Sequence, residues 1–266
     1  MSTLNLDLKH PLLLRSLKFV AVVVLLGALA QVMRPVEQPA WEAVQARRSE
    51  LPLSQIEGAL GQGVVFGVLG GFRTILADFT WIRLYVAWEK REAAELDALI
   101  RLVTTLDPDS VYFWVNGARM LAYDVPHWRM DDAGGVQILP DARQRAIAEE
   151  QAQQAFVLLA QAREFHPNEP KLDLEVAQIY LNRLQDYANA AKWFRQASEM
   201  PGAPYYAART YAKLLRVQGL DQQAYDFLKQ LHQELPDGDP YAQKNIVLER
   251  IRGLEASLAI PEALRY

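Results

Sequence analysis

The strongest constraint on the fold of this chain is a pattern that recurs every 34 or 35 residues. Each copy has two small or apolar residues seven apart, a leucine or phenylalanine between them, and a closing proline. The copies are Ala155, Leu159, Ala162 and Pro167; Ala190, Phe194, Ala197 and Pro201; and Ala224, Leu228, Leu231 and Pro236. Residues three and four apart share one face of a helix, and proline cannot continue the helix. A helical segment with this period is typical of an array of helical hairpins.

A second amphipathic helix precedes each of the last two copies. We expect these helices over residues 172–184 and 205–217. Gly219 follows the second of them and suits a turn between two helices, because glycine readily takes a positive φ. Gln185 stands at the corresponding position after the first helix and departs from that pattern.

These segments resemble tetratricopeptide repeats: residues 203–236 match that family's spacing throughout, and residues 168–201 match it closely. The resemblance implies an all-α solenoid that offers its surface to a protein or peptide partner. We expect the solenoid over 72–258, with repeats at 72–108, 109–167, 168–201 and 203–236, a capping helix at 239–258 that begins at the N-cap Asp239, and a tail at 259–266.

The repeat at 109–167 is too long for one hairpin. Pro108 and Pro167 are 59 residues apart, so about 25 residues are extra by comparison with the 34-residue period. We expect helices over 111–123 and 144–164, with an insertion at 124–143. The insertion is rich in proline and glycine, which predicts an ordered loop.

The N-terminal residues 1–33 predict a membrane anchor. Residues 19–33 carry no charge, and Lys9, Arg15 and Lys18 precede them. This places the N-terminus in the cytoplasm and the repeats outside it, which in a bacterium means an inner-membrane, single-pass protein. Two alternatives stay open: a signal peptide cleaved after Ala30, which would leave a soluble secreted module, and a buried core helix.

Residues 34–71 predict a tether that ends in a glycine-rich apolar segment at 58–71. This segment is either a membrane-surface or helix-packing element, or a buried strand or loop that leads into the first repeat. The run from Leu69 to Arg73, with the pairs Ala77-Asp78 and Trp81-x-Arg83 after it, resembles a motif of membrane-anchored bacterial repeat proteins of unassigned function.

That motif is a candidate docking site for a partner or for the membrane surface. Its residues are Gly70, Gly71, Phe72, Arg73, Asp78, Trp81 and Arg83. The alternative is an N-terminal cap that holds the glycine-rich segment against the first hairpin.

The sequence contains no pattern that predicts chemistry. Cysteine is absent, which excludes disulfides and thiolate sites, and the net charge of −4 does not favour nucleic acid as a partner. No nucleotide-binding or nucleophile motif occurs. His127, Asp131 and Asp132 either ligate a cation or belong to a solvated loop. We therefore expect no catalytic, cofactor-binding or metal-binding residue and no enzymatic activity; the rival is an enzyme that uses the 124–143 insertion and a bound metal.

The first helices of the hairpins carry a basic and aromatic set of side chains, which we treat as a candidate partner-binding groove. The set is Tyr112, Arg119, Tyr123, Arg183, Tyr206, Arg209, Lys213 and Arg216. A basic groove edged by tyrosines suits an acidic or C-terminal peptide. The alternative is a solvated charged face. The sequence thus predicts a membrane-anchored scaffold or adaptor of a bacterial envelope complex, or else an accessory subunit of a larger membrane machine for transport or secretion.

Overall fold

A computed structural model describes residues 71–266 of the chain, and within that range every regular element is a helix. The chain divides into two compact units, residues 1–55 and 56–266, and the described helices belong to the second. The helices are α4 (Arg73–Glu89), α5 (Ala93–Leu106), α6 (Val111–Arg119), α7 (Val125–Asp132), α8 (Asp141–Phe165), α9 (Pro170–Gln178), α10 (Tyr187–Ser198), α11 (Tyr206–Val217), α12 (Asp221–Glu234) and α13 (Lys244–Ser257). Two π-helical turns, η1 (Met120–Asp124) and η2 (Ile179–Leu184), extend α6 and α9, and a short 3₁₀ turn, η3 (Glu262–Leu264), lies near the C-terminus. The expected all-α fold is confirmed for this part of the chain.

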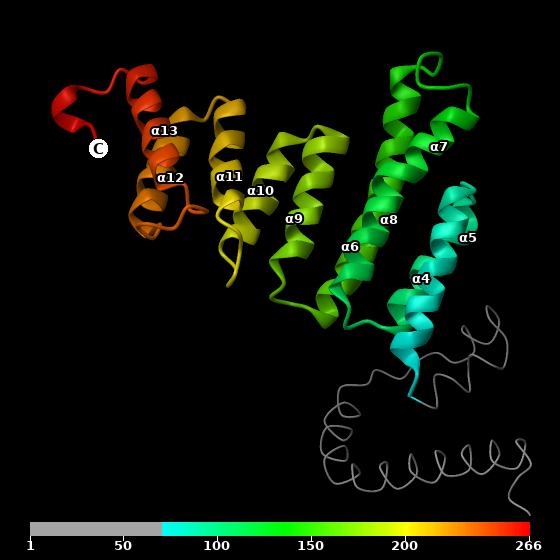
Figure 1. Ribbon diagram of the computed structural model, residues 1–266. Helices are drawn as coiled ribbons and strands as arrows, with labels where there is room; N and C mark the ends of the chain where they lie inside the picture. The colour runs from blue at the N-terminus through cyan, green and yellow to red at the C-terminus, as the bar shows by residue number, and fades with distance from the viewer. Residues whose placement is uncertain (1–70) are drawn as a thin grey trace, which may run out of the picture. The chain divides into compact units, whose positions relative to one another are not determined.

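Successive helices pack side by side, as Figure 1 shows for α9 through α13. The expected helix partners are in contact: α4 packs on α5, α6 on α8, α9 on α10, and α11 on α12. The alanine, leucine and phenylalanine positions of the repeat pattern are buried between them, and alanine lets two helices approach closely, whereas the closing prolines are exposed. Ala190 and Ala224, together with Phe194 and Leu228, belong to one core that runs from α9 to α13.

The two hairpin turns that differ in sequence both contain a left-handed residue at the corresponding position. Gly219 has a φ of 76°, and Gln185 has a φ of 54° at the corresponding place. Both residues are left-handed, although only glycine takes that conformation without steric cost. The departure at Gln185 therefore keeps the left-handed residue at a steric cost. The hydrogen bond after it runs from the Asp186 N–H to the Tyr180 carbonyl, one residue farther back than the bond from the Leu220 N–H to the Leu215 carbonyl.

The prediction of a loop over residues 124–143 is wrong for the first half of that range, which is helical. Residues 125–132 form α7, which continues directly from η1 and buries Trp128 and Met130. Met130 packs against Ile147 and Ala148 of α8. Pro126 sits in the first turn of α7, directly after the π-helical turn η1, so the proline that indicated a loop instead lies within a continuous helical run.

The C-terminal cap also differs from its expected bounds. α13 begins at Lys244 rather than Asp239, whose carboxylate instead accepts a hydrogen bond from the Tyr241 N–H in a turn. The tail folds back onto the helices. The Tyr266 N–H donates to Glu255 over 2.6 Å, and the Tyr266 hydroxyl lies 3.0 Å from Nδ1 of His232.

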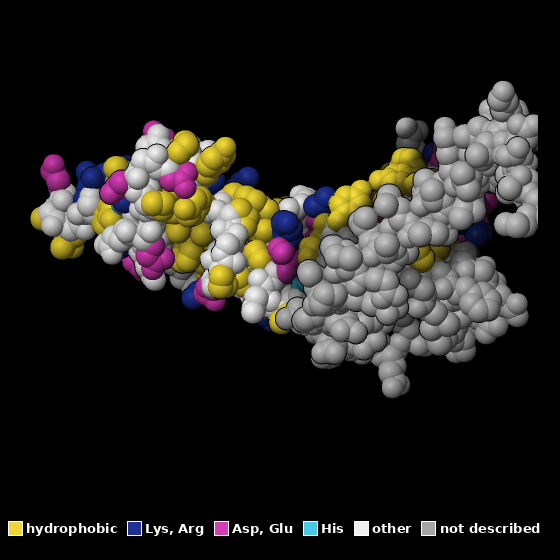
Figure 2. Space-filling view, turned by 60° about the horizontal axis from the view of Figure 1, so that its bottom comes forward, with side chains coloured by type: hydrophobic (Ala, Val, Ile, Leu, Met, Phe, Trp, Pro, Cys, Tyr) yellow, Lys and Arg dark blue, Asp and Glu magenta, His cyan; other side chains and the backbone are white. Residues whose placement is uncertain are grey.

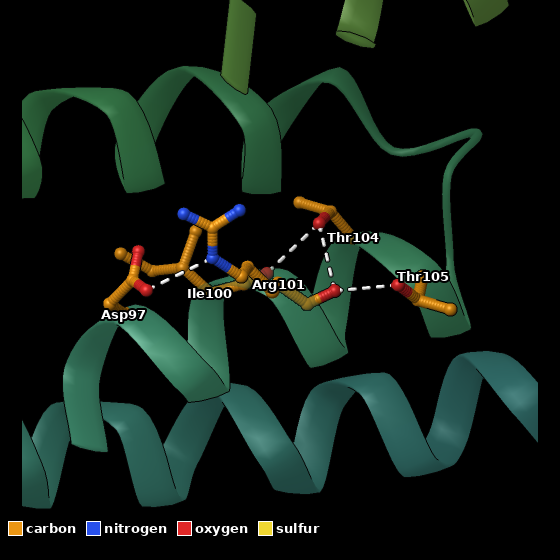
Figure 3. Close-up of polar contacts among 5 residues, drawn as sticks. All are labelled: Asp97, Ile100, Arg101, Thr104 and Thr105. Carbon is orange, nitrogen blue, oxygen red and sulfur yellow. Dashed lines mark hydrogen bonds and ion pairs between the residues drawn. The ribbon is translucent and has the colours of Figure 1, made fainter. Parts of the chain in front are cut away.

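Side-chain hydroxyls inside α5 find their partners within the helix itself. The buried Thr104 donates to the carbonyls of Ile100 and Arg101, and Thr105 donates to the same Arg101 carbonyl (Figure 3). Arg101 also pairs with Asp97 one turn earlier. The threonine hydroxyl protons are therefore used within α5, which lets Thr104 be buried without a partner from another helix.

Within residues 71–266, no helix is both long enough and apolar enough to cross a bilayer. The expected anchor at residues 19–33 lies outside the described residues.

Candidate functional site

The structure does not gather the eight candidate groove residues in one place. Six of them line three separate hollows, whereas Tyr123 and Arg209 line none of these. On the face drawn in Figure 2, Lys and Arg side chains occur in small groups between hydrophobic patches, not as one basic strip. The predicted groove is therefore better described as a central pocket, a basic pocket and a third hollow beside α7.

The central pocket has a volume of about 280 Å³ and lies where α6, α9 and α11 meet. Tyr112, Arg119 and Tyr206 line it, as the sequence predicts, together with Glu175 of α9. The Arg119 Nε donates to the Glu175 Oε2 over 2.8 Å, and the Glu175 side chain is only 2% exposed. Hydrogen bonding to this carboxylate raises the pKa of Arg119 above its ordinary value. The cation at the centre of the predicted groove is thus already neutralised.

Two tyrosines enclose this ion pair. Burial raises the pKa of Tyr123, and the Glu175 charge raises it further, while a hydrogen bond to Asn182 opposes both. Burial likewise raises the pKa of Tyr206. Both hydroxyls therefore remain protonated and uncharged, and they can donate and accept hydrogen bonds without adding charge beside the ion pair.

The basic pocket lies farther along the chain, at α11, and has a volume of about 430 Å³. Lys213 and Arg216 of α11 line it together with Arg250 of α13 and with the apolar residues Val217 and Leu228. Arg216 has one acidic neighbour, Asp221, at 3.6 Å, which is a long ion pair. Cations beside apolar residues suit a carboxylate that is attached to an apolar residue.

Arg209 points away from these pockets and holds the loop before α13. Its guanidinium donates to the backbone carbonyls of Tyr241 and Ala242. Burial lowers the pKa of Arg209, and the charge of Arg250 lowers it further. Arg250 donates in turn to the Arg209 carbonyl over 3.4 Å, so Arg209 contributes to the position of Arg250.

Arg183 lies in the third hollow, which has a volume of about 470 Å³ and is also lined by His127, Asp141 and Arg145. Burial lowers the pKa of Arg183. Its Nε and one terminal nitrogen have no hydrogen-bond partner among the described residues. This arginine belongs to the contact between η2 and α7–α8 and is not part of either other pocket.

The candidate docking motif is divided between two sides of α4. On the inner side, the Arg73 Nε donates to the Leu106 carbonyl over 3.0 Å, and Trp81 is buried against the rings of Tyr112 and Phe113. Arg83 pairs with Glu95 of α5 over 2.7 Å. These contacts attach α4 to α5 and α6.

The outer side of α4 carries Phe72 and Asp78, both of them exposed. Gly71 precedes the helix with a φ of 86°, and Gly70 lies outside the described residues. The motif therefore has a structural half and an exposed half.

In the part of the chain that the structure describes, no group of three or more His, Asp or Glu side chains is arranged to hold a metal ion. His127 and Asp131 lie 3.6 Å apart on successive turns of α7. Asp131 also accepts from Arg91 over 3.0 Å, so this carboxylate joins the α4–α5 turn to α7.

Sequence reasoning missed Glu175 and Arg250. Glu175 stands between Leu174 and Val176, and a charge alternating with apolar residues inside a helix is a usable signal of a buried, paired acid. Arg250 gave no such signal, because α13 meets α11 only through tertiary packing. Comparison of this chain with family models, with curated proteins and with solved structures gave no match.

Proposed function

We propose that this chain is a non-enzymatic scaffold or adaptor of a bacterial envelope complex, built as a tetratricopeptide-type α-solenoid and anchored by its N-terminal apolar run. Paired helices that pack on their neighbours support the solenoid, because each pair buries its apolar face on the next and leaves an extended surface for partners. The anchor rests on the sequence of residues 19–33 and on the basic residues before them.

The observation that carries the binding role is the basic pocket. Lys213, Arg216 and Arg250 line it together with Val217 and Leu228. Among the described residues, Arg216 has Asp221 at 3.6 Å, and Arg250 donates a long hydrogen bond to the Arg209 carbonyl. An acidic side chain or a carboxyl terminus next to an apolar residue satisfies all of these groups at once. The partner we propose is therefore an acidic or C-terminal peptide segment, held at α11 and α13.

Peptide binding tests the proposal. The full chain in detergent is titrated into a short fluorescent peptide of aspartate and leucine with a free carboxyl terminus, and anisotropy is followed. The double variant Lys213→Ala/Arg250→Ala removes two partly exposed charge contacts at about 0.7 kcal/mol each, which corresponds to an affinity loss of about tenfold. The matched control is Lys192→Ala on α10, an exposed lysine outside the three pockets.

Added salt should weaken this binding, because exposed charges are screened. A lysine-and-leucine peptide of the same length should not bind. Equal affinity of the double variant and the control for the acidic peptide would remove the basic pocket as the binding site.

A further inference from the structure

The outer face of α4 is the most exposed apolar surface among the described helices. Five large side chains follow one another at intervals of three, four, three and four residues, which places them on one stripe of the helix. They are Phe72, Ile75, Phe79, Ile82 and Val86, with exposed fractions of 58, 50, 66, 61 and 45%. We call these five residues the α4 stripe.

No other described helix carries more than two exposed large apolar side chains. The opposite side of α4 is packed against the rest of the protein, since Ala77, Trp81 and Leu84 are buried. A surface helix normally has one apolar face, and that face is the one it buries. α4 has two apolar faces, so a contiguous exposed patch remains that calls for a second covering element.

The chain itself supplies a matching element directly before α4. Residues 58–70 carry no charge and include Val64, Val68 and Leu69. Gly63, Gly67 and Gly71 are spaced four apart, a pattern that presents small residues on one side of a helix and lets another helix approach closely. Gly71 has a positive φ, the conformation that commonly ends one helix before the next begins.

Two other occupants fit the stripe less well. Helices that lie on lipid are rich in Lys and Arg on their polar side, whereas α4 has only Arg73 and Arg83, which bond to α5, and places Asp78 beside the stripe. A second copy of the chain would compete with a segment attached at the very end of α4. A short covalent link gives such a segment an effective concentration in the millimolar range, which a second copy does not reach.

We infer that residues 58–70 fold back and pack on the α4 stripe, so that they close the N-terminal end of the helical array. The inference decides between the alternatives drawn from the sequence, since it assigns the glycine-rich segment to helix packing. It stands independently of the peptide-binding role of the basic pocket.

The absence of cysteine from the chain allows a clean cross-linking test. A turn at Gly71 brings residues at nearly equal distances on its two sides together, so Val64, seven residues before it, should lie near Phe79, eight residues after it. We expect the variant Val64→Cys/Phe79→Cys in native membranes to form a disulfide within one chain on mild oxidation, seen by gel mobility and by mass spectrometry of the linked peptides. The matched control, Val64→Cys/Val157→Cys, uses an exposed valine on α8 and should not link.

A second measurement does not depend on how well the two introduced cysteines are aligned for a disulfide. Phe79→Cys in the full chain should react slowly with a maleimide, whereas Val157→Cys should react freely. Adding Gly67→Leu removes the close approach and should speed the reaction at position 79 by about tenfold while leaving position 157 unchanged.

Three results would overturn the inference. Disulfides between chains at position 79 would assign the stripe to a second copy. A bimane label at position 79 that shifts to the blue only when vesicles are added would assign it to lipid. Equal and fast maleimide reaction at positions 79 and 157 would show that nothing covers the stripe.

Discussion

The Arg119 guanidinium lies against the Glu175 carboxylate, with 2.8 Å between Nε and Oε2, at the meeting point of α6 and α9. Glu175 is buried and Arg119 is half exposed. The other carboxylate oxygen of Glu175 has no hydrogen-bond partner among the described residues. The pair therefore links two consecutive hairpins and also fixes the charge of the central pocket.

Removing the arginine should destabilise the fold. In Arg119→Ala the buried Glu175 carboxylate loses its cation, and an unsatisfied buried charged group costs about 2–3 kcal/mol. Urea unfolding followed by circular dichroism measures this difference. The variant Arg119→Met/Glu175→Leu, which removes both charges and keeps the volume, should recover most of the lost stability.

The control for that comparison is the ion pair between Arg129 and Glu150, which joins α7 to α8 over 2.9 Å on the surface. Exposed pairs contribute at most about 1 kcal/mol, so Arg129→Ala should change the unfolding free energy by less than that. Equal losses in Arg119→Ala and Arg129→Ala would contradict a structural role for the Arg119–Glu175 pair.

Substitutions at the left-handed residues of the two hairpin turns should have opposite effects on stability. Gln185→Gly places a glycine where the backbone is left-handed and should stabilise the protein by up to about 1 kcal/mol. Gly219→Ala places a Cβ at the same turn position of the next hairpin, where no atom obstructs it, so only backbone strain of about 1 kcal/mol should destabilise the protein. Urea unfolding of both variants measures the sign of each change in the free energy of unfolding. Two changes of the same sign would contradict the equivalence of these two turn positions.

Acid should release the C-terminal tail. Burial raises the pKa of Glu255, but hydrogen bonds from the Tyr266 N–H, Arg252 and Tyr225 outweigh it and hold the pKa below its ordinary value. A carboxylate with a lowered folded-state pKa contributes stability that is fully present above its unfolded pKa of about 4.3 and is lost as the pH falls through the lower folded-state value.

Thermal melts from pH 6 to pH 3 test this linkage against Glu255→Gln, which cannot ionise. The wild type should melt at a higher temperature than the variant above about pH 5, and the gap should narrow below about pH 4. A difference in melting temperature that stays constant through this pH range would show that the Glu255 charge does not stabilise the packing of the tail.

The spacing of apolar residues in the sequence predicted a helix correctly where that helix has one apolar face. The spacing of Ala190, Phe194 and Ala197 predicts α10, and the structure buries all three residues. It failed at Pro126, because proline usually ends a helix, whereas here the helical run continues through the π-helical turn η1 into α7. It also failed at Asp239, an N-cap residue type that here closes a turn before the helix.

The candidate site was harder to predict than the fold. Five of the eight groove residues line the central and basic pockets, since helix spacing alone places them on one side of α6 and α11. Which cation is free and which is paired depends on Glu175 and Arg250, which come from other helices. No local pattern in the sequence specifies those tertiary contacts.

The central claim, an acidic peptide held by Lys213, Arg216 and Arg250, is tested most directly by methyl NMR of the full chain in detergent with the aspartate-and-leucine peptide. The account predicts shifts at the methyl groups of Val217 and Leu228, which line the pocket, and none at Val157 on α8. It also predicts that Lys213→Ala/Arg250→Ala abolishes those shifts. Shifts that spare Val217 and Leu228, or that persist unchanged in the double variant, would contradict it.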